Sequence, residues 1–206
     1  MGSSPVSYWN THARTYDLSM RLLGRPMPRM VALASEAVRR HRRVLEIGSG
    51  SGLVTVGLAR AAGAVFSTDY AAAMVATTEA AVRREGLRNV HCEQADLYAL
   101  PFPNGSFDAV VAANVLHLVP DLPAAFAALR RILEPGGVLV LPTFCHAETT
   151  VSRAVSRGLS LTGFPGKRRF TAQSLRHAAE SSGVAITREE LLPGVIPIGY
   201  LQGIRS

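Results

Sequence analysis

A glycine-rich stretch near residue 50 is the part of the sequence best suited to hold a ligand. Residues 44–52 read VLEIGSGSG, so alternate glycines follow directly on an apolar, strand-like run. Glycine lets a backbone turn sharply and approach a ligand without interference from a Cβ atom. In an open parallel sheet, ligands bind outside the carboxyl ends of the strands. The stretch therefore predicts a binding loop for a nucleotide-like molecule.

Two acidic residues and one leucine narrow the choice of ligand. Asp69 ends the next strand-like run, where a carboxylate can accept hydrogen bonds from both hydroxyls of a ribose. The dinucleotide fingerprint G-x-G-x-x-G needs a glycine at position 53, where Leu53 stands instead. Glu46, just before the glycines, would repel a pyrophosphate but could hold the free amine of a sulfonium cofactor. These residues favour a sulfonium cofactor over a nicotinamide dinucleotide.

The loop lies in a chain whose strand-like and helix-like runs alternate. Alternation at this spacing predicts βαβ units, and right-handed crossovers then place helices on both faces of a parallel sheet. The last two strands are expected to pair antiparallel through Pro193-Gly194. We expect strands at residues 43–47, 64–68, 90–94, 107–113, 138–141, 184–192 and 196–204, and helices at 51–62, 71–85, 122–133 and 172–182.

Length and composition predict one α/β domain over residues 1–206. Of the 206 residues, 48% are apolar, which suffices for one sizeable core. Cys92 and Cys145 form no C-x-x-C pair, which disfavours a disulfide scaffold and a zinc site. We divide the domain into an N-terminal lid (1–40), a cofactor-binding core (41–143), a substrate-side insertion (144–182) and a terminal strand pair (183–206).

Hydropathy and charge give expectations about location and partners. The sequence has neither a long apolar run nor a secretory leader, so we expect a cytoplasmic protein. The formal net charge is +7, and Lys167 is the single lysine among 22 basic residues. This balance indicates either an anionic partner or a genomic preference for arginine codons, and composition alone leaves both open.

Five segments, in order, resemble the motifs of the class I S-adenosylmethionine-dependent methyltransferases, in their small-molecule, methyltransferase-11-like branch. The segments are EIGSGSG at 46–52, STDY at 67–70, EQADL at 93–97 with LPF at 100–102, FDAVVAANVLHL at 107–118, and LEPGGVLV at 133–140. Together they cover roughly residues 40–142. The resemblance implies a Rossmann-like, doubly wound, seven-stranded sheet that is mostly parallel, with the last strand inserted antiparallel. It also implies S-adenosylmethionine as cofactor, without a metal.

The resemblance further implies which residues would contact the cofactor. The glycine loop would line the methionine part, and Glu46 would hold the amine directly or through water. Asp69 would bind the ribose, and Asp96 with the Leu97 amide would bind the adenine edge, although Asp96 could instead only cap a turn. The full set of implied contacts is Glu46, Gly48, Ser49, Gly50, Gly52, Asp69, Tyr70, Met74, Asp96, Leu97 and the backbone carbonyl of Asn114.

Histidines and aromatic residues outside these motifs are candidates for the acceptor side. His117 follows the fourth strand and could act as a general base or simply fix a loop. Phe144 and His146 follow the fifth strand and should lie beside it. A metal held by the two histidines is disfavoured, because two ligands without a carboxylate make a poor site. Tyr8, His12 and Tyr16 precede the first strand, in a segment that resembles the cofactor-covering lid of small-molecule members.

The expected activity is methyl transfer by in-line displacement to an oxygen, nitrogen or carbon atom of a small molecule. Alternatives are a phospholipid N-methyltransferase in peripheral contact with a membrane, a non-catalytic binding protein and a nucleic-acid methyltransferase. The last is disfavoured because residues 113–116 (ANVL) offer neither Pro-Pro nor an aromatic residue to clamp a flipped base. No nucleic-acid partner is therefore expected, and the sequence does not predict an oligomeric state.

Overall fold

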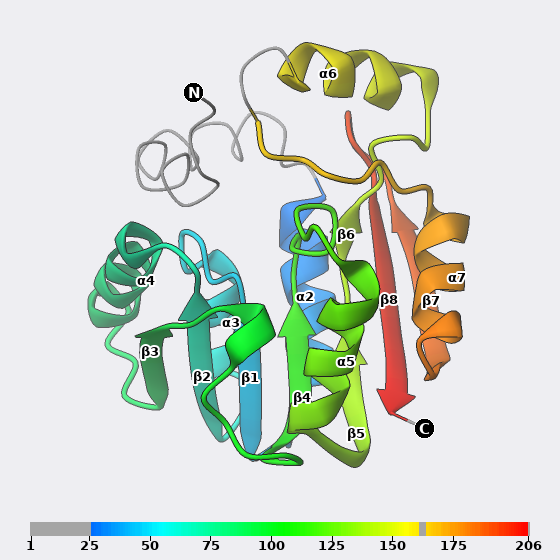
Figure 1. Ribbon diagram of the computed structural model, residues 1–206. Helices are drawn as coiled ribbons and strands as arrows, with labels where there is room; N and C mark the ends of the chain where they lie inside the picture. The colour runs from blue at the N-terminus through cyan, green and yellow to red at the C-terminus, as the bar shows by residue number, and fades with distance from the viewer. Residues whose placement is uncertain (1–25, 161–163, 206) are drawn as a thin grey trace.

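Five parallel strands form the centre of the sheet in the computed structural model, which describes residues 26–160 and 164–205. They are β1 (Arg43–Ile47), β2 (Ala64–Asp69), β3 (Val90–Gln94), β4 (Phe107–Ala112) and β5 (Leu133–Val140). Their order across the sheet is β3-β2-β1-β4-β5 (Figure 1). The winding direction therefore reverses between β1 and β4, which is where open α/β sheets bind ligands.

Antiparallel strands complete one side of the sheet. The last strand, β8 (Ile198–Arg205), lies between β5 and β7 (Val184–Leu192) and is antiparallel to both. This confirms the expected mostly parallel, doubly wound sheet with an inserted antiparallel last strand. A short strand of two residues, β6 (Thr143–Phe144), pairs with the beginning of β8 and brings the sheet to eight strands.

Helices cover both faces of the sheet and enclose two separate apolar cores. On one face, α2 (Met27–Ala37) and α3 (Leu53–Ala59) pack on the sheet, and α4 (Ala72–Arg84) contacts α3. On the other face, α5 (Leu122–Ile132), α7 (Ala172–Ser181) and the short 3-10 helix η1 (Leu97–Ala99) pack on the sheet. The remaining helix of the described residues, α6 (Thr150–Ser160), lies beyond the carboxyl ends of the parallel strands (Figure 1).

Several element boundaries differ from the sequence prediction, and the largest shift is at β5, which begins at Leu133 instead of at residue 138. The helix expected at 51–62 is shorter, because the glycine loop extends to Gly52, whose positive φ of 79° precedes the first helical turn. The helix expected at 122–133 ends at Ile132, and β5 begins at once because Leu133 is extended and pairs with Phe107. The turn at 135–137 is accommodated by a register shift in the pairing of β4 with β5.

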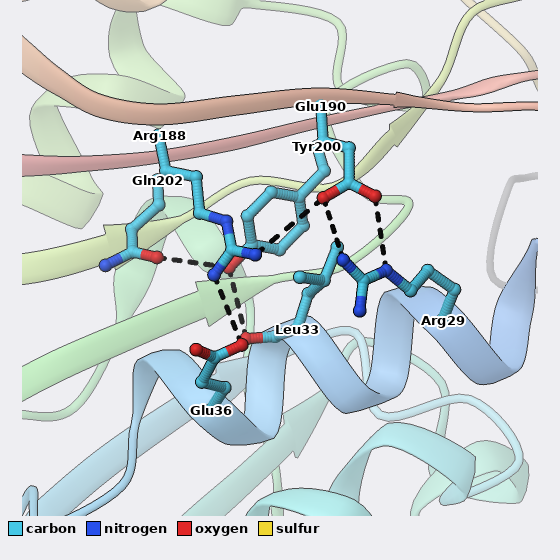
Figure 2. Close-up of polar contacts among 7 residues, drawn as sticks. All are labelled: Arg29, Leu33, Glu36, Arg188, Glu190, Tyr200 and Gln202. Atoms are coloured by element: carbon cyan, nitrogen blue, oxygen red, sulfur yellow. Dashed lines mark hydrogen bonds and ion pairs between the residues drawn. The ribbon is translucent and has the colours of Figure 1, made fainter.

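A polar network fastens α2 to the antiparallel end of the sheet (Figure 2). Nε and Nη2 of Arg29 donate to the two carboxylate oxygens of Glu190 at 3.2 Å each, and Arg188 contacts Glu36 at 3.2 Å. These ion pairs are largely exposed and contribute little individually. The buried Tyr200 hydroxyl donates to a backbone carbonyl of α2 at 3.2 Å, which ties this helix to β8 from within the core.

Candidate cofactor-binding site

A cavity of about 500 Å³ opens at the carboxyl ends of β1, β2 and β4, at the switch point of the sheet. Its volume falls in the range of small-molecule sites. Most of the cofactor contacts implied by the sequence lie on its wall, whereas Glu46, Ser49 and Gly52 do not. The predicted residues on the wall are Gly48, Gly50, Asp69, Tyr70, Met74, Asp96, Leu97 and Asn114.

The glycine loop adopts a conformation that side chains would hinder. Gly48, Gly50 and Gly52 all have positive φ angles, between 55° and 79°. A Cβ atom on Gly48 would lie 2.5 Å from a methyl group of Val115, which is itself on the cavity wall. The Gly48 and Ser49 amides donate to the Thr68 carbonyl at 2.8 and 3.0 Å, which closes the loop against the end of β2.

Asp69 connects the glycine loop to the beginning of α4. Its two carboxylate oxygens accept hydrogen bonds from the Gly50 amide at 3.0 Å and the Ala71 amide at 2.9 Å. Burial raises the pKa of this carboxyl, and the hydrogen bonds from backbone amides oppose the shift. Because each carboxylate oxygen can accept more than one hydrogen bond, both remain able to bind ligand hydroxyls.

Glu46 lies beneath the glycine loop and away from the cavity wall. One carboxyl oxygen accepts hydrogen bonds from the hydroxyls of Thr55 (2.6 Å) and Ser67 (2.7 Å), and its Oε1 is buried without a partner. Burial raises the pKa of Glu46 from about 4.5 to about 7, against the opposing effect of the two hydroxyls. The structure thus gives Glu46 hydroxyl partners that the sequence did not predict.

Ser49 and Gly52 shape the loop from its buried side. The Thr78 hydroxyl donates to Ser49 Oγ at 2.9 Å, and it also contacts the Gly50 carbonyl at 3.2 Å. A Cβ atom on Gly52 would lie 3.1 to 3.2 Å from α4 atoms of Thr78 and Ala81. These two loop residues therefore pack against α4, where they fix the path of the loop.

Asp96 has a structural role and also faces the cavity. Its side chain accepts a hydrogen bond from the Tyr98 amide at 2.9 Å and so caps η1. Asp96 also lines the cavity, together with Leu97 and Tyr98. Capping the turn is therefore compatible with the predicted contact between Asp96 and the adenine edge. Met74, which is buried, also lines the cavity.

Asn114 stands at the end of β4 in a left-handed conformation with φ of 55°. Asparagine tolerates this conformation better than most residues with a side chain. The Asn114 amide donates to the Pro142 carbonyl at 2.7 Å, and its side-chain nitrogen contacts the sulfur atoms of Met27 and Met30 at 3.8 Å. Its Oδ1 is buried without a partner.

The structure brings the predicted acceptor-side residues His117, His146 and Phe144 together. The two imidazole centroids are 5.3 Å apart, and Phe144 lies edge-on to His117 at 5.9 Å. Burial lowers the pKa of His117 to about 3 and that of His146 to about 4. None of the three residues lines the cavity, although His117 is close to it in sequence. Tyr8, His12 and Tyr16 lie outside the described residues.

Several cavity residues were missed by the sequence analysis. Tyr98 and Lys167 carried a usable signal, because Tyr98 follows Asp96 closely and Lys167 is the only lysine of the chain. Leu118, Val119 and Pro120 come shortly after a strand that ends at the switch point of the sheet. This place in the sequence could have identified them as cavity residues. The additional wall residues are Ile47, Ala95, Tyr98, Ala113, Val115, Leu118, Val119, Pro120 and Lys167.

The carboxylates in and beneath the cavity fit an organic cofactor that has a sugar and a positively charged amino-acid part. Carboxylates at the ends of β2 and β3 face the cavity, and the unpartnered Glu46 Oε1 lies under its glycine loop. Across residues 26–160 and 164–205, no group of three or more His, Cys, Asp or Glu side chains could hold a metal ion. None of the helices in these ranges has both the length and the hydropathy of a membrane-spanning segment.

Comparison with known proteins identifies relatives of the region that carries the cavity. The model of the Methyltransferase domain family matches residues 45–141. Malonyl-[acyl-carrier protein] O-methyltransferase from Halorhodospira halophila is 37% identical over 141 residues, which are 66% of this chain and 46% of that protein. The chain thus spans about half the length of this relative.

Two further comparisons extend over most of the chain. A ubiquinone/menaquinone biosynthesis C-methyltransferase from a Marinomonas species is 29% identical over 198 residues, covering 91% of this chain and 79% of that protein. The crystal structure of a SAM-dependent methyltransferase from Aquifex aeolicus superposes with a TM-score of 0.72, covering 96% of this chain and 98% of that chain. At 16% identity, the latter likeness shows the fold alone.

Proposed function

We propose that the chain, which matches the Methyltransferase domain family over residues 45–141, is a class I S-adenosylmethionine-dependent methyltransferase that methylates a small-molecule acceptor. The observation that carries the proposal is the cavity at the switch point, where the glycine loop, Asp69 and Asp96 share one wall. The names of the Halorhodospira and Marinomonas relatives support this proposal, because they state a malonyl group on a carrier protein and a step of ubiquinone or menaquinone biosynthesis.

The described residues suggest how the cofactor would be held. Asp69, already oriented by the Gly50 and Ala71 amides, would accept hydrogen bonds from the ribose hydroxyls. Asp96 and the Leu97 amide would bind the adenine edge. Glu46 lies behind the loop and does not line the cavity. Its carboxylate would therefore hold the cofactor amine through a bridging water molecule or by electrostatic attraction over a longer distance.

The chain's residues would mainly orient the acceptor and exclude water. When bound, S-adenosylmethionine supplies a methyl group already activated by the positive sulfonium sulfur. Because this methyl group would arrive already activated, the residues of the chain would have to hold the acceptor atom in line with it, and positioning would account for most of the catalysis. His117 can accept a proton only from an acidic hydroxyl, because its pKa near 3 makes it a weak base.

A methyl-transfer assay tests the acceptor class directly. The full chain would be incubated with methyl-labelled S-adenosylmethionine and a bacterial extract, which is then divided into small metabolites, phospholipids, protein and nucleic acid. The proposal predicts enzyme-dependent label in the small metabolites, and the Asp69→Ala variant should eliminate it. Label confined to phospholipid or nucleic acid would contradict a small-molecule acceptor while retaining methyltransferase activity.

A further inference from the structure

Two buried histidines beside the cofactor cavity lack hydrogen-bond partners. His117 is 3% exposed and His146 is 4% exposed, and they follow β4 and β5 at the sheet edge that carries the glycine loop. Nδ1 of His117 and both ring nitrogens of His146 make no hydrogen bond within the described part of the chain. A buried polar atom without a hydrogen-bond partner is energetically unfavourable, so three such atoms in one place indicate a missing ligand.

The electrostatics of the pair limit the kind of ligand that it can bind. Burial lowers both pKa values, and the charge of Arg169 lowers that of His146 further, so both rings are neutral at physiological pH. A neutral imidazole offers one N–H donor and one acceptor nitrogen. Together the two rings can therefore accept a hydrogen bond from a hydroxyl group and donate one to its oxygen.

Charged acceptors fit this pair less well than neutral ones. No Asp or Glu of the described residues joins the histidines in a group that could hold a cation, and Arg169 would repel an ammonium group. A carboxylate would lose its hydration against two uncharged rings. A centroid separation of 5.3 Å also allows one oxygen atom to contact both rings.

Aromatic rings surround the pair and favour a flat, apolar body behind the hydroxyl group. Phe144 lies edge-on to His117 with ring centroids 5.9 Å apart. Phe164 stacks on His117 at 6.1 Å with an interplanar angle of 15°, and it lies 6.1 Å from His146. Such rings bind aromatic ligands through stacked and edge-on contacts.

The pair is connected to the cavity through a shared stretch of backbone. Lys167 lines the cavity, and the amides of Lys167 and Arg168 donate to the His117 carbonyl at 2.9 and 3.0 Å. Leu118, directly after His117, also lines the cavity. Residues 164–170 cross above the sheet between α6 and α7, at the end where the parallel strands terminate (Figure 1). The two sites are therefore neighbours at one sheet edge.

We propose that His117 and His146 bind the hydroxyl group of an uncharged, planar, apolar methyl acceptor of the phenol class. This inference rests on the proposed function, because it names the acceptor class for the same cofactor site. The two histidines are acceptor-binding residues in this account, and the phenylalanines form the walls on which the ring of the acceptor packs.

Matched naphthalene derivatives test this assignment on the full chain saturated with S-adenosylhomocysteine. Calorimetry would measure binding of naphthol, naphthoate and naphthylmethylamine, and nitrogen NMR of labelled histidine would follow the imidazole signals. Naphthol should bind and shift the signals of His117 and His146. The variants His117→Gln and His146→Gln should each weaken naphthol binding by about tenfold or more, which corresponds to one lost hydrogen bond to a buried partner. His177→Gln, on the exposed face of α7, is the control and should change nothing.

The outcomes separate this inference from the proposed function. The three variants and the wild type should bind S-adenosylhomocysteine with the same affinity. If the wild type does not bind S-adenosylhomocysteine at all, the proposed function is refuted instead of this inference. The inference is overturned if naphthol fails to bind, if it binds the glutamine variants equally, or if only naphthoate or naphthylmethylamine binds. Tight binding of zinc chloride that depends on both histidines would also overturn it, in favour of a metal site.

Discussion

At the residue scale, two aspartates each accept hydrogen bonds from two backbone amides, at opposite ends of the sheet. Asp69 binds the Gly50 and Ala71 amides beside the cavity, whereas Asp108 binds the Arg42 and Arg43 amides at 2.7 and 2.9 Å. The structural role of the two carboxylates is therefore similar. Only Asp69 faces the cavity, and this difference allows binding to be separated from folding.

We predict that Asp69→Asn weakens binding of S-adenosylhomocysteine by about tenfold or more, because it removes the charge that accepts the ribose hydroxyls. Asp108→Asn is the matched control and should lower the free energy of unfolding without changing this affinity. Calorimetry and urea denaturation of both variants measure the two effects. Equal affinity in the Asp69 variant and the wild type would remove Asp69 from the cofactor site.

The buried carboxyl of Glu46 predicts a pH-dependent stability. Its pKa is raised to about 7 when folded, from an ordinary value near 4.5, so between these values the folded chain retains a proton that the unfolded chain has lost. The free energy of unfolding contributed by Glu46 therefore falls as pH rises through this window, by at most about 3 kcal/mol. Glu46→Gln removes this dependence.

Urea denaturation at pH 5 and pH 8 measures the effect of Glu46→Gln. The variant should gain stability relative to the wild type on going from the lower to the higher pH. Glu79→Gln, at a half-exposed position on α4, controls for the loss of one negative charge. If the variant and the wild type differ in the free energy of unfolding by the same amount at pH 5 and at pH 8, the Glu46 carboxyl has an ordinary pKa in the folded protein.

At the scale of elements, the glycine loop joins β1 to α3 through backbone angles that only glycine adopts readily. Gly48 and Gly86 both have positive φ angles, of 74° and 67°. A Cβ atom on Gly48 would meet Val115 at 2.5 Å, whereas one on Gly86, after α4, would meet nothing within 4 Å. A side chain at either position would therefore be strained by the positive φ angle, but only a side chain at Gly48 would also clash with a neighbouring residue.

Alanine substitutions at these two glycines give the next prediction. Gly86→Ala should cost about 1–2 kcal/mol of stability and leave binding of S-adenosylhomocysteine unchanged, because only the left-handed strain is added. Gly48→Ala should add a displacement of Val115 or of the loop at the cavity wall, and so weaken binding by about tenfold or more. Fluorimetric melting curves and calorimetry separate the two quantities. Unaltered binding by Gly48→Ala would show that the loop does not shape the site.

The elements that carry the site follow patterns that are local in sequence, which explains why they were predictable. The apolar run of β1 followed by alternate glycines predicted both the strand and the loop, and the position of Asp69 at the end of β2 was also correct. The boundary at Leu133 was not predictable locally, because it depends on pairing with Phe107 across the sheet. The helix α6 was not predicted, because its buried residues are Ser152 and Ser156 and they leave no apolar stripe in the sequence.

At the scale of the whole molecule, contacts between distant segments decide what the sequence could not. The hydroxyl partners of Glu46 come from α3 and β2, and a single sequence does not show which hydroxyls will meet. The stacking of Phe164 on His117 likewise depends on the path of the chain after α6. The antiparallel insertion of the last strand, by contrast, followed from the family resemblance and is confirmed by the position of β8 between β5 and β7.

Every functional role described above requires that the cavity between the glycine loop, Asp69 and Asp96 binds S-adenosylmethionine. Calorimetric titration of the folded chain with S-adenosylhomocysteine, beside an identical titration with NAD, measures this binding. We expect saturable binding of S-adenosylhomocysteine at one site per chain, with no heat from NAD. Binding of NAD at this site, or no binding of S-adenosylhomocysteine, would show that the cavity is not a site for S-adenosylmethionine.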